Sequence, residues 1–471
     1  MTRPQITALI VATALFMEQV DSTVIATALP TIAADIGTDP IRLKLALTAY
    51  LLSLATFIPI SGWAADRFGA RLVFRAAICV FILGSILCSV STSLTEFVLS
   101  RVVQGAGGAM MVPVGRLLVL RSARKSELLN AMAWLTVPAL MGPLVGPPLG
   151  GFIATYFDWR WIFWLNVPVG MVGLVLVTIF IDDIRADAPA PLDLRGFFLC
   201  AIGLSGLVFG LSVLGQNMLP LPMTMTLITI GTIATGLYLL HARGKAHPLL
   251  DLKLMRLPTF YCAMVGGLFF RVGIGAVPFL LPLVLQLGLG MSAFEAGMLT
   301  LFGAVGALAM KVSAQPIVRR FGYKTTLVWN SLISAAFLAV MALFAYDLPA
   351  VLVSSILLVG GFFRSLQFTA LNTLAYSEVE RPMMSAATSF YAVAQQVCLA
   401  MGVAVAAAVV ELQRAARGDG QILAQDFVAA FLFVGICSAL SVIYFLRLPP
   451  DAGEELTGRT HSPPRKPVAS T

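Results

Sequence analysis

Charge is scarce in this chain of 471 residues, of which only 11% are Asp, Glu, Lys or Arg and 59% are hydrophobic. Soluble domains are typically about 25% charged and about 45–50% apolar. The composition therefore argues against a soluble fold. Runs of 18 or more mostly apolar residues recur along the chain, and a helix of that length can span a bilayer. The sequence predicts an all-α polytopic membrane protein.

The sequence also lacks the residue groupings that enzymes and ATP-driven pumps need. Only three histidines are present, and no Ser/His/Asp grouping or nucleotide-binding loop is found, which argues against an enzyme and against an ATP-driven pump. The cysteines show neither metal-ligand spacing nor a secreted disulfide pattern. They all fall in apolar segments: Cys79, Cys88, Cys200, Cys262, Cys398 and Cys437. We therefore expect no enzymatic activity, no metal site and no cofactor.

Hydropathy over a window of about 19 residues gives about fourteen membrane-spanning segments. They lie near 6–30, 44–64, 72–92, 96–120, 129–154, 161–182, 194–215, 222–241, 259–288, 293–316, 325–346, 349–374, 384–410 and 426–446.

The Lys and Arg residues indicate the orientation of these segments. If the N-terminus is cytoplasmic, the basic residues concentrate in the cytoplasmic connections, as the positive-inside rule requires. The outside connections then hold only Arg42, Lys44, Arg160, Arg414 and Arg417. This distribution explains the net charge of +8 by topology rather than by nucleic-acid binding. We expect an even number of spans and both termini in the cytoplasm.

A short internal repeat suggests two related halves. GWAADRFGARLV (62–73) follows the second segment and QPIVRRFGYKTTL (315–327) follows the tenth, and both contain Arg-Phe-Gly-x-basic. Many secondary transporters are built from such repeats and bind substrate between them. We expect a six-helix bundle in residues 1–182, two additional helices with linkers in 183–257, a second six-helix bundle in 258–447, and a disordered tail in 448–471.

The first repeat copy has a recognisable pattern, G-x-x-x-D-R-x-G-x-R. Glycine permits tight turning and close approach, and Asp66 can cap a helix or pair with an arginine. A basic connection with a helix cap would use the same residue types, so that simpler interpretation stays open. The pattern resembles motif A of the major facilitator superfamily, in which this loop is a cytoplasmic latch. The matching residues are Gly62, Asp66, Arg67, Gly69 and Arg71.

A second pattern lies in the fifth segment, LMGPLVGPPLGG (140–151). Glycines four residues apart share one helix face, where another backbone can approach closely, and prolines there should kink the helix. A generic packing seam of small residues is the alternative. The pattern resembles the antiporter motif C of drug exporters in the same superfamily. Its residues are Gly142, Pro143, Gly146, Pro147, Gly150 and Gly151.

A third pattern, SRVVQGAGGAMM (100–111), places Arg101 and Gln104 in the fourth segment and resembles motif B, whose Arg is tied to proton transfer. Taken together, the motifs resemble the fourteen-helix drug:proton antiporters over essentially the whole chain. This resemblance implies the major facilitator fold, with two six-helix halves and two extra helices. It also implies a proton-coupled multidrug exporter in the bacterial inner membrane. Small molecules, protons and the lipid bilayer are then the partners, and a monomer is compatible with this function.

Two acidic residues within the apolar segments are candidate proton carriers. Of 23 Asp and Glu residues, only Glu18 and Asp21 lie near the middle of a segment, and their i, i+3 spacing puts them on one helix face. A charge at the centre of a membrane helix costs roughly 2.5–3.5 kcal/mol, so such residues are usually functional. We expect Glu18, Asp21 and Arg101 to take part in proton coupling. A permanent structural pair with Arg101, Arg271 or Arg364 is the alternative.

The remaining polar residues within segments are candidates for the substrate cavity. They are Gln104, Arg271, Arg364 and Gln367, and Arg364 with Gln367 repeats the R-x-x-Q spacing of Arg101 with Gln104. The two arginines could bind anionic groups or neutralise the acids of the first segment. The sequence therefore leaves an alternative function open, a dedicated exporter of a metabolite or of an anionic metal chelate such as metal-citrate.

Overall fold

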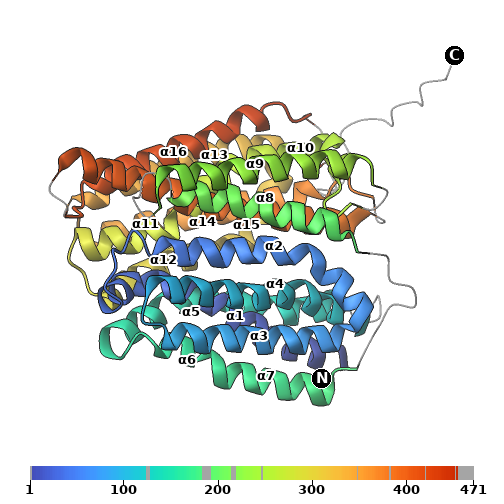
Figure 1. Cartoon of the computed structure of the whole chain (residues 1–471). Coiled ribbons are helices and arrows are strands. Elements are labelled where there is room, and N and C mark those ends of the chain that lie inside the picture. The colour runs from blue at the N-terminus through green and yellow to red at the C-terminus, as the bar shows by residue number, and fades with distance from the viewer. Residues whose placement is uncertain are drawn as a thin grey trace.

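The computed structural model describes residues 3–122, 128–182, 192–213, 219–245, 248–346, 348–380, 383–418, 421–450 and 452–453. Within these ranges the chain is built from helices that run roughly parallel or antiparallel to one another (Figure 1). The predicted disordered tail lies outside the described residues from residue 454 onward. Four basic residues that we predict to lie in cytoplasmic connections are also outside the described residues: Arg124, Lys125, Arg185 and Arg381.

The helices fall into three groups along the chain. The N-terminal half comprises α1 (Arg3–Asp35), α2 (Lys44–Phe68), α3 (Ala70–Val90), α4 (Leu94–Ser122), α5 (Leu128–Tyr156), α6 (Trp161–Trp164) and α7 (Asn166–Phe180). A helical hairpin follows, α8 (Leu194–Val213) and α9 (Leu221–Arg243). The C-terminal half comprises η1 (Leu252–Arg256), α10 (Pro258–Gly275), α11 (Val277–Leu283), η2 (Val284–Gly288), α12 (Ala293–Phe321), α13 (Tyr323–Val340), η3 (Met341–Ala345), α14 (Ala350–Ala375), α15 (Met384–Arg417) and α16 (Asp426–Phe445).

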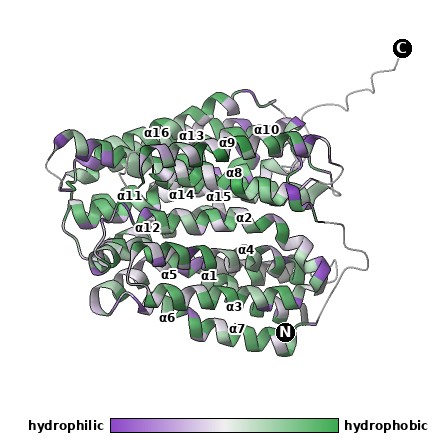
Figure 2. Cartoon of the chain, in the orientation of Figure 1, coloured by the Kyte–Doolittle hydropathy of each residue, from purple (hydrophilic) through white to green (hydrophobic). Residues whose placement is uncertain are grey.

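Thirteen helical segments of the described chain are long and apolar enough to cross a membrane. The 29-residue α5, part of whose side chains lie outside the described set, is a further helix of sufficient length. The outward-facing surface carries large apolar side chains, such as Val351 and Ile179, which are 79% and 67% exposed. Figure 2 shows hydrophobic colour along the helices and hydrophilic colour mainly near their ends. Such a surface suits a lipid environment rather than water.

The helices agree with the fourteen predicted segments, but several run further than predicted. The helix α1 ends at Asp35, α12 at Phe321 and α15 at Arg417. A helix can continue past the hydrocarbon region of the bilayer. The long charged side chains of its last turns then reach the membrane interface. Arg414 and Arg417 were therefore wrongly expected in a connection, because they occupy the last turns of α15.

The internal repeat is visible in two tight turns at one end of the bundle. Gly69 joins α2 to α3 with φ 96°, and Gly322 joins α12 to α13 with φ 78°. Each glycine donates its N–H to the carbonyl four residues earlier, Ala65 or Val318. Positive φ favours glycine because other residues clash there. We call this the basic end of the bundle, since Arg67, Arg71 and Arg75 surround the first turn and Arg319, Arg320 and Lys324 the second.

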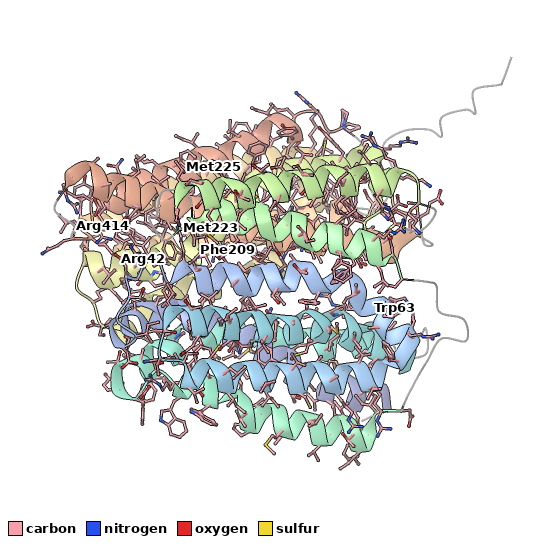
Figure 3. The ribbon with its side chains drawn as sticks, in the orientation of Figure 1. Arg42, Trp63, Phe209, Met223, Met225 and Arg414 are labelled. Atoms are coloured by element: carbon pink, nitrogen blue, oxygen red, sulfur yellow. The ribbon has the colours of Figure 1, made fainter. Side chains whose placement is uncertain are left out.

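The two halves meet along two helix pairs, α5 with α12 and α2 with α15. Within the N-terminal half, α1 packs against α4, α5 and α7. The hairpin α8–α9 lies beside α2, and α8 also contacts α15 (Figure 1). Figure 3 shows Trp63 towards the basic end and Arg42 and Arg414 at the opposite end. The helix α1 thus packs mainly against helices of its own half and also contacts α11 and α12 of the other half.

Candidate functional site

Asp21 of α1 is the centre of a buried polar network. Its Oδ2 accepts a hydrogen bond from Arg101 Nη1 at 2.7 Å, and its Oδ1 accepts bonds from Gln104 Nε2 at 2.8 Å and Asn166 Nδ2 at 2.7 Å. Asp21 is 1% exposed, and Arg101 and Gln104 are fully buried. Ser85 Oγ accepts further bonds from Gln104 and Asn166. One carboxylate therefore joins α1 to α4 and α7, with α3 behind them.

Glu18 lies one turn before Asp21 and has a different environment. Its Oε1 accepts a hydrogen bond from the Tyr50 hydroxyl of α2 at 3.1 Å. Its Oε2 is buried without a hydrogen-bond partner among the described residues. Gly108 of α4 leaves room for Tyr50, since a Cβ there would lie 3.2 Å from the Tyr50 hydroxyl oxygen. A carboxyl group with an unpaired buried oxygen is less costly to bury in its neutral form.

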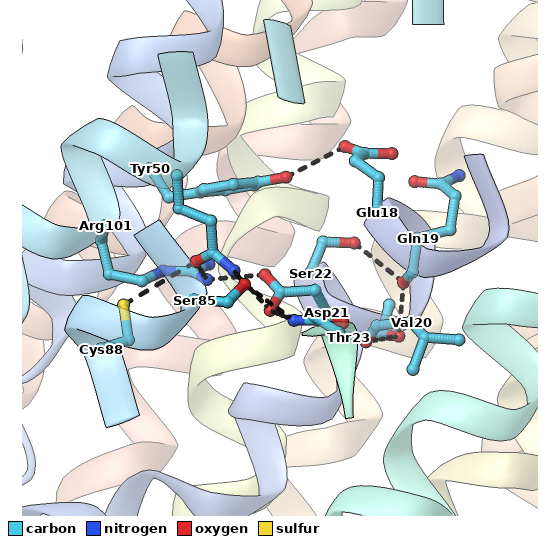
Figure 4. Close-up of polar contacts among 12 residues, drawn as sticks. Glu18, Gln19, Val20, Asp21, Ser22, Thr23, Tyr50, Ser85, Cys88 and Arg101 are labelled. Atoms are coloured by element: carbon cyan, nitrogen blue, oxygen red, sulfur yellow. Dashed lines mark hydrogen bonds and ion pairs between the residues drawn. The ribbon is translucent and has the colours of Figure 1, made fainter. Parts of the chain in front are cut away.

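The two carboxyl groups are connected through Tyr50 and Arg101. The guanidinium of Arg101 lies over the Tyr50 ring at 4.1 Å from its centre, while the Tyr50 hydroxyl reaches Glu18 (Figure 4). The resulting chain runs Glu18, Tyr50, Arg101, Asp21. A change in the charge of Asp21 will therefore alter the position or charge balance of Arg101, which in turn affects Tyr50 and Glu18.

The glycines of α5 form a seam against α1. A Cβ atom at Gly142, Gly146 or Gly150 would overlap atoms of Gln19, Thr23 or Val24 respectively. Thr27 Oγ1 donates to the Pro147 carbonyl at 3.2 Å across the same seam. All three glycines and the prolines lie within one continuous helix, although the side chain of Pro143 lies outside the described set.

The seam continues into the C-terminal half. A Cβ at Gly151 would overlap the backbone of Ala293 at the start of α12, and one at Gly297 of α12 would overlap the Pro147 backbone. The helix α5 thus packs against α1 on one face and α12 on another, at the end of the bundle opposite to the basic end. Only residues without a side chain permit both contacts.

The motif around Gly69 makes contacts within the N-terminal half. Arg71 donates a hydrogen bond to the Thr178 carbonyl of α7. Asp66 is half-buried in the last turns of α2, and Gly62 and Arg67 are exposed. The role of this loop as a latch between the halves stays a prediction.

The two R-x-x-Q patterns do not occupy equivalent positions. Gln104 donates to Ser85, which lies 16 residues after Gly69, whereas Gln367 donates to Ser331, which lies 9 residues after Gly322. The second pattern therefore lies about two helical turns closer to the basic end, at 3.6 residues per turn. It is not a further copy of the internal repeat.

Gln367 and Arg271 lie in the C-terminal half, away from the acids of α1. Gln367 is fully buried, and its Oε1 accepts from Asn330 Nδ2 at 2.7 Å. Arg271 is also fully buried and lies 4.4 Å from the centre of the Tyr391 ring. Of the predicted cavity residues, only Gln104 contacts Asp21 directly. The structure thus separates the polar residues into two groups, one in each half.

Sequence reasoning missed Tyr50, Ser85 and the burial of Lys44. Lys44 was expected in a connection but is the first residue of α2 and is fully buried. Tyr50 and Ser85 carry no pattern of their own within apolar segments. One feature could have predicted Tyr50: a tyrosine hydroxyl within a membrane helix needs a polar partner. The two acids of the first segment are candidate partners for it.

Comparison with known proteins identifies the family. The sequence profile of the Major Facilitator Superfamily matches residues 11–403. The chain belongs to the major facilitator superfamily. Members of this superfamily are transporters rather than enzymes, and the chain is accordingly a multi-pass membrane transporter.

The chain is also similar to bacterial relatives over nearly its whole length. It is 37% identical over 452 residues to the "Putative multidrug resistance protein MdtD" of Pectobacterium atrosepticum, covering 95% of this chain and 96% of that protein. The protein of the same name from Yersinia pestis is 37% identical over 447 residues, covering 94% and 96%. The predicted membership of the major facilitator superfamily, with similarity to the MdtD proteins, is thereby confirmed.

Two solved structures of distant relatives share the fold. A D-xylose-proton symporter superposes with a TM-score of 0.67 at 16% identity, covering 95% of this chain and 98% of that one. The POT family transporter PepTSo superposes with a TM-score of 0.70 at 15% identity, covering 95% and 97%. The predicted all-helical major facilitator fold is confirmed.

Proposed function

We propose that this transporter exports small amphipathic compounds in exchange for protons, with Asp21 as the principal proton-coupling group. The observation that carries the proposal is the buried network of Asp21 with Arg101, Gln104 and Asn166. An ionisable group on α1 that is hydrogen-bonded to two neighbouring helices, α4 and α7, can transmit its protonation state to their packing. Because Arg101 neutralises the carboxylate, protonation of Asp21 would release Arg101 and weaken this junction.

The direction of transport and the breadth of substrates are inferred from the relatives. The MdtD proteins carry a multidrug resistance name, and this chain is 37% identical to them over 96% of their length. The basic end, with Arg67, Arg71 and Arg319 beside its turns, would then lie on the cytoplasmic side of a bacterial inner membrane, as would both termini.

Reporter fusions at the C-terminus and in the connection between α15 and α16 test this topology and should lie on opposite sides of the membrane. The same side for both would refute it.

The proposal divides the chain into two six-helix bundles, 1–182 and 258–447, that rock about a central site. The inserted segment 183–257 supplies α8, which contacts both α2 and α15, and α9, which packs against α8. The glycine seam of α5, which meets α1 and α12, is the packing surface whose geometry must be kept while the halves move.

The test uses Asp21→Asn in purified protein and in proteoliposomes with an imposed pH gradient. Asparagine keeps the size and hydrogen bonding of the side chain but exchanges no proton. We expect uphill export to be abolished and some downhill movement to remain, because coupling requires a proton affinity that depends on bound substrate. Wild-type protein should release protons when substrate from a panel of cationic, neutral and anionic amphipathic compounds is added. Equal proton release by Asp21→Asn would place the coupling group elsewhere.

A second candidate, the export of an anionic metabolite or chelate, is favoured by Arg271. This arginine is fully buried, and its Nε and Nη2 have no hydrogen-bond partner among the described residues. A carboxylate on the substrate would pair with it bidentately. Transport restricted to anionic members of the panel, and lost in Arg271→Gln, would favour this function over broad drug export.

A further inference from the structure

Lys44, the first residue of α2, is a buried cation to which the proposed function gives no role. It is 0% exposed, unlike Arg364 of α14, which is only partly buried. The Nζ of Lys44 has no hydrogen-bond partner among the residues that the structure describes. Transfer of an ammonium group from water to an apolar interior is costly unless hydrogen bonds replace the lost water. The burial of Lys44 therefore requires a physical explanation.

The surroundings of Lys44 belong to the junction between the two halves. Helix α2 packs against α15, and Leu43 and Leu47 of α2 belong to the same buried hydrophobic cluster as Val410 of α15. One turn after Lys44, Thr48 is 1% exposed, and its Oγ1 also has no hydrogen-bond partner among the described residues. Residues four apart lie on the same helix face. Two unpartnered polar groups thus lie on one face of α2 at this end of the bundle.

The carboxylates that could compensate Lys44 are engaged with Arg414. Glu411 of α15 attracts the ammonium electrostatically, but its Oε2 lies 3.5 Å from Arg414 Nη1, and 32% of its side chain is exposed. The same Nη1 lies 2.5 Å from Asp39 Oδ2. Neither carboxylate accepts a hydrogen bond from Lys44. The cost of burying the ammonium is therefore only partly offset.

We propose that Lys44 opposes closure of the end of the molecule opposite to the basic end. With this end closed, the ammonium has lost its water without gaining a hydrogen bond, and separation of α2 from α15 lets water solvate it again. The pair of Arg414 with Asp39 favours closure and Lys44 opposes it, so both states stay populated, as a transport cycle requires. The proposal rests on the rocking of the two halves, but not on proton coupling or on a particular substrate.

The experiment measures the two populations by distances between spin labels at Ala34 and Leu423 in purified full-length protein without substrate. Lys44→Met removes the charge and keeps an unbranched apolar chain. The ratio of open to closed protein should fall about tenfold, since an apolar residue in place of a buried charge is often stabilising. The same comparison in an Arg414→Gln background, where loss of the ion pair should raise the open population, keeps both states measurable.

Two further variants separate burial from net charge. Arg42→Met is the matched control, because it makes the same change in charge at the same end (Figure 3) but at an exposed side chain, and it should leave the ratio unchanged. Thr48→Val removes the second unpartnered group while keeping its shape, and it should lower the ratio by about threefold. Equal shifts in Lys44→Met and Arg42→Met would show that net charge, not burial, sets the ratio.

The outcomes also distinguish a failure of this proposal from a failure of the rocking motion. A larger open population in Lys44→Met, with a lower unfolding temperature, would show that attraction to Glu411 holds this end closed, which overturns the proposal. Two distances with an unchanged ratio in Lys44→Met would remove the role of Lys44 and leave the rocking motion intact. A single distance in both wild type and Arg414→Gln would refute the rocking motion, and the role of Lys44 with it.

Discussion

Glu18 and Asp21 are one helical turn apart, but their partners give them different chemistry. Asp21 has a positive partner in Arg101, whereas Glu18 has only the neutral hydroxyl of Tyr50. A carboxylate without a positive partner is the better candidate to pair with a cationic substrate. We therefore assign Glu18 to substrate selection rather than to the coupling step.

Glu18→Gln is expected to keep uphill export of neutral compounds and to weaken transport of cationic ones about tenfold, since each 1.4 kcal/mol of lost interaction is a factor of ten. The kcat/KM for cationic and neutral compounds of similar size checks this in proteoliposomes. Tyr50→Phe is the matched control, because it removes the hydrogen bond to Glu18 while the carboxyl group remains. Equal losses for cationic and neutral compounds in Glu18→Gln would assign Glu18 to packing or coupling.

At the residue scale, the sequence predicted the acids but not their partners. Two carboxyl groups in an apolar segment stand out because charge there is costly. Tyr50 and Ser85 do not stand out, since isolated hydroxyl residues are common in membrane helices. Their contacts depend on how α2 and α3 rotate about α1 and α4, which the order of residues along one helix does not specify.

At the scale of single elements, the glycine seam of α5 is a contact that larger side chains would disrupt. Gly146→Leu would place a side chain into Thr23 of α1, and overpacking of this kind costs about 1–3 kcal/mol. We expect exchange to be abolished or to leak protons, because α1 carries the coupling acids. Proton influx without substrate is the measurement. Gly236→Leu on α9 is the control, since a Cβ there meets no atom within 4 Å; similar effects in both variants would contradict the seam.

The hairpin α8–α9 is stabilised by a polar contact near the basic end. Asp193 Oδ1 accepts from Gly196 N–H at 3.1 Å, which caps α8, and lies 2.8 Å from His241 Nε2 of α9. Burial tends to raise the pKa of Asp193, but the bonds from His241 and Gly196 outweigh it and lower the pKa below its usual value. A depressed pKa contributes stability above the unfolded value of about 3.9, and that stability is lost as pH falls through the folded-state pKa.

The unfolding temperature of the purified protein should therefore decrease as the pH is lowered below 5. This decrease should be smaller in Asp193→Asn. Asparagine retains a cap acceptor, whereas Asp193→Ala should cost about 1 kcal/mol at neutral pH through loss of the cap. Hydrogen exchange of residues 194–213 reports the same change locally. An unaltered acid dependence in Asp193→Asn would assign it to other carboxylates.

At the scale of the whole molecule, the two halves are joined by polar contacts at the end opposite to the basic end. Arg414 Nη1 of α15 donates to Asp39 Oδ2 at 2.5 Å, Gln286 Nε2 donates to the Thr27 carbonyl at 2.8 Å, and the Phe294 N–H donates to Thr155 Oγ1 at 3.0 Å. These bonds, together with the Gly151 and Gly297 contacts, hold this end closed.

Hydropathy and the bias of basic residues predicted the helices and the alternation of their direction across the membrane. They could not predict which end is closed, since a transporter adopts both states with one sequence.

The last prediction concerns the equilibrium between these states. The side chains of Arg414 and Asp39 are 21% and 22% exposed, so their ion pair contributes at most about 1 kcal/mol. Arg414→Gln should therefore shift the population towards the state open at this end by up to about fivefold. Distances between spin labels at Ala34 and Leu423, at this end of the two halves, measure that population. Arg42→Gln removes a positive charge from the same end of the molecule (Figure 3) without breaking a described pair, and it should leave the distances unchanged. A shift of equal size in both variants would indicate that net charge at this end, rather than the contact between Arg414 and Asp39, sets the equilibrium.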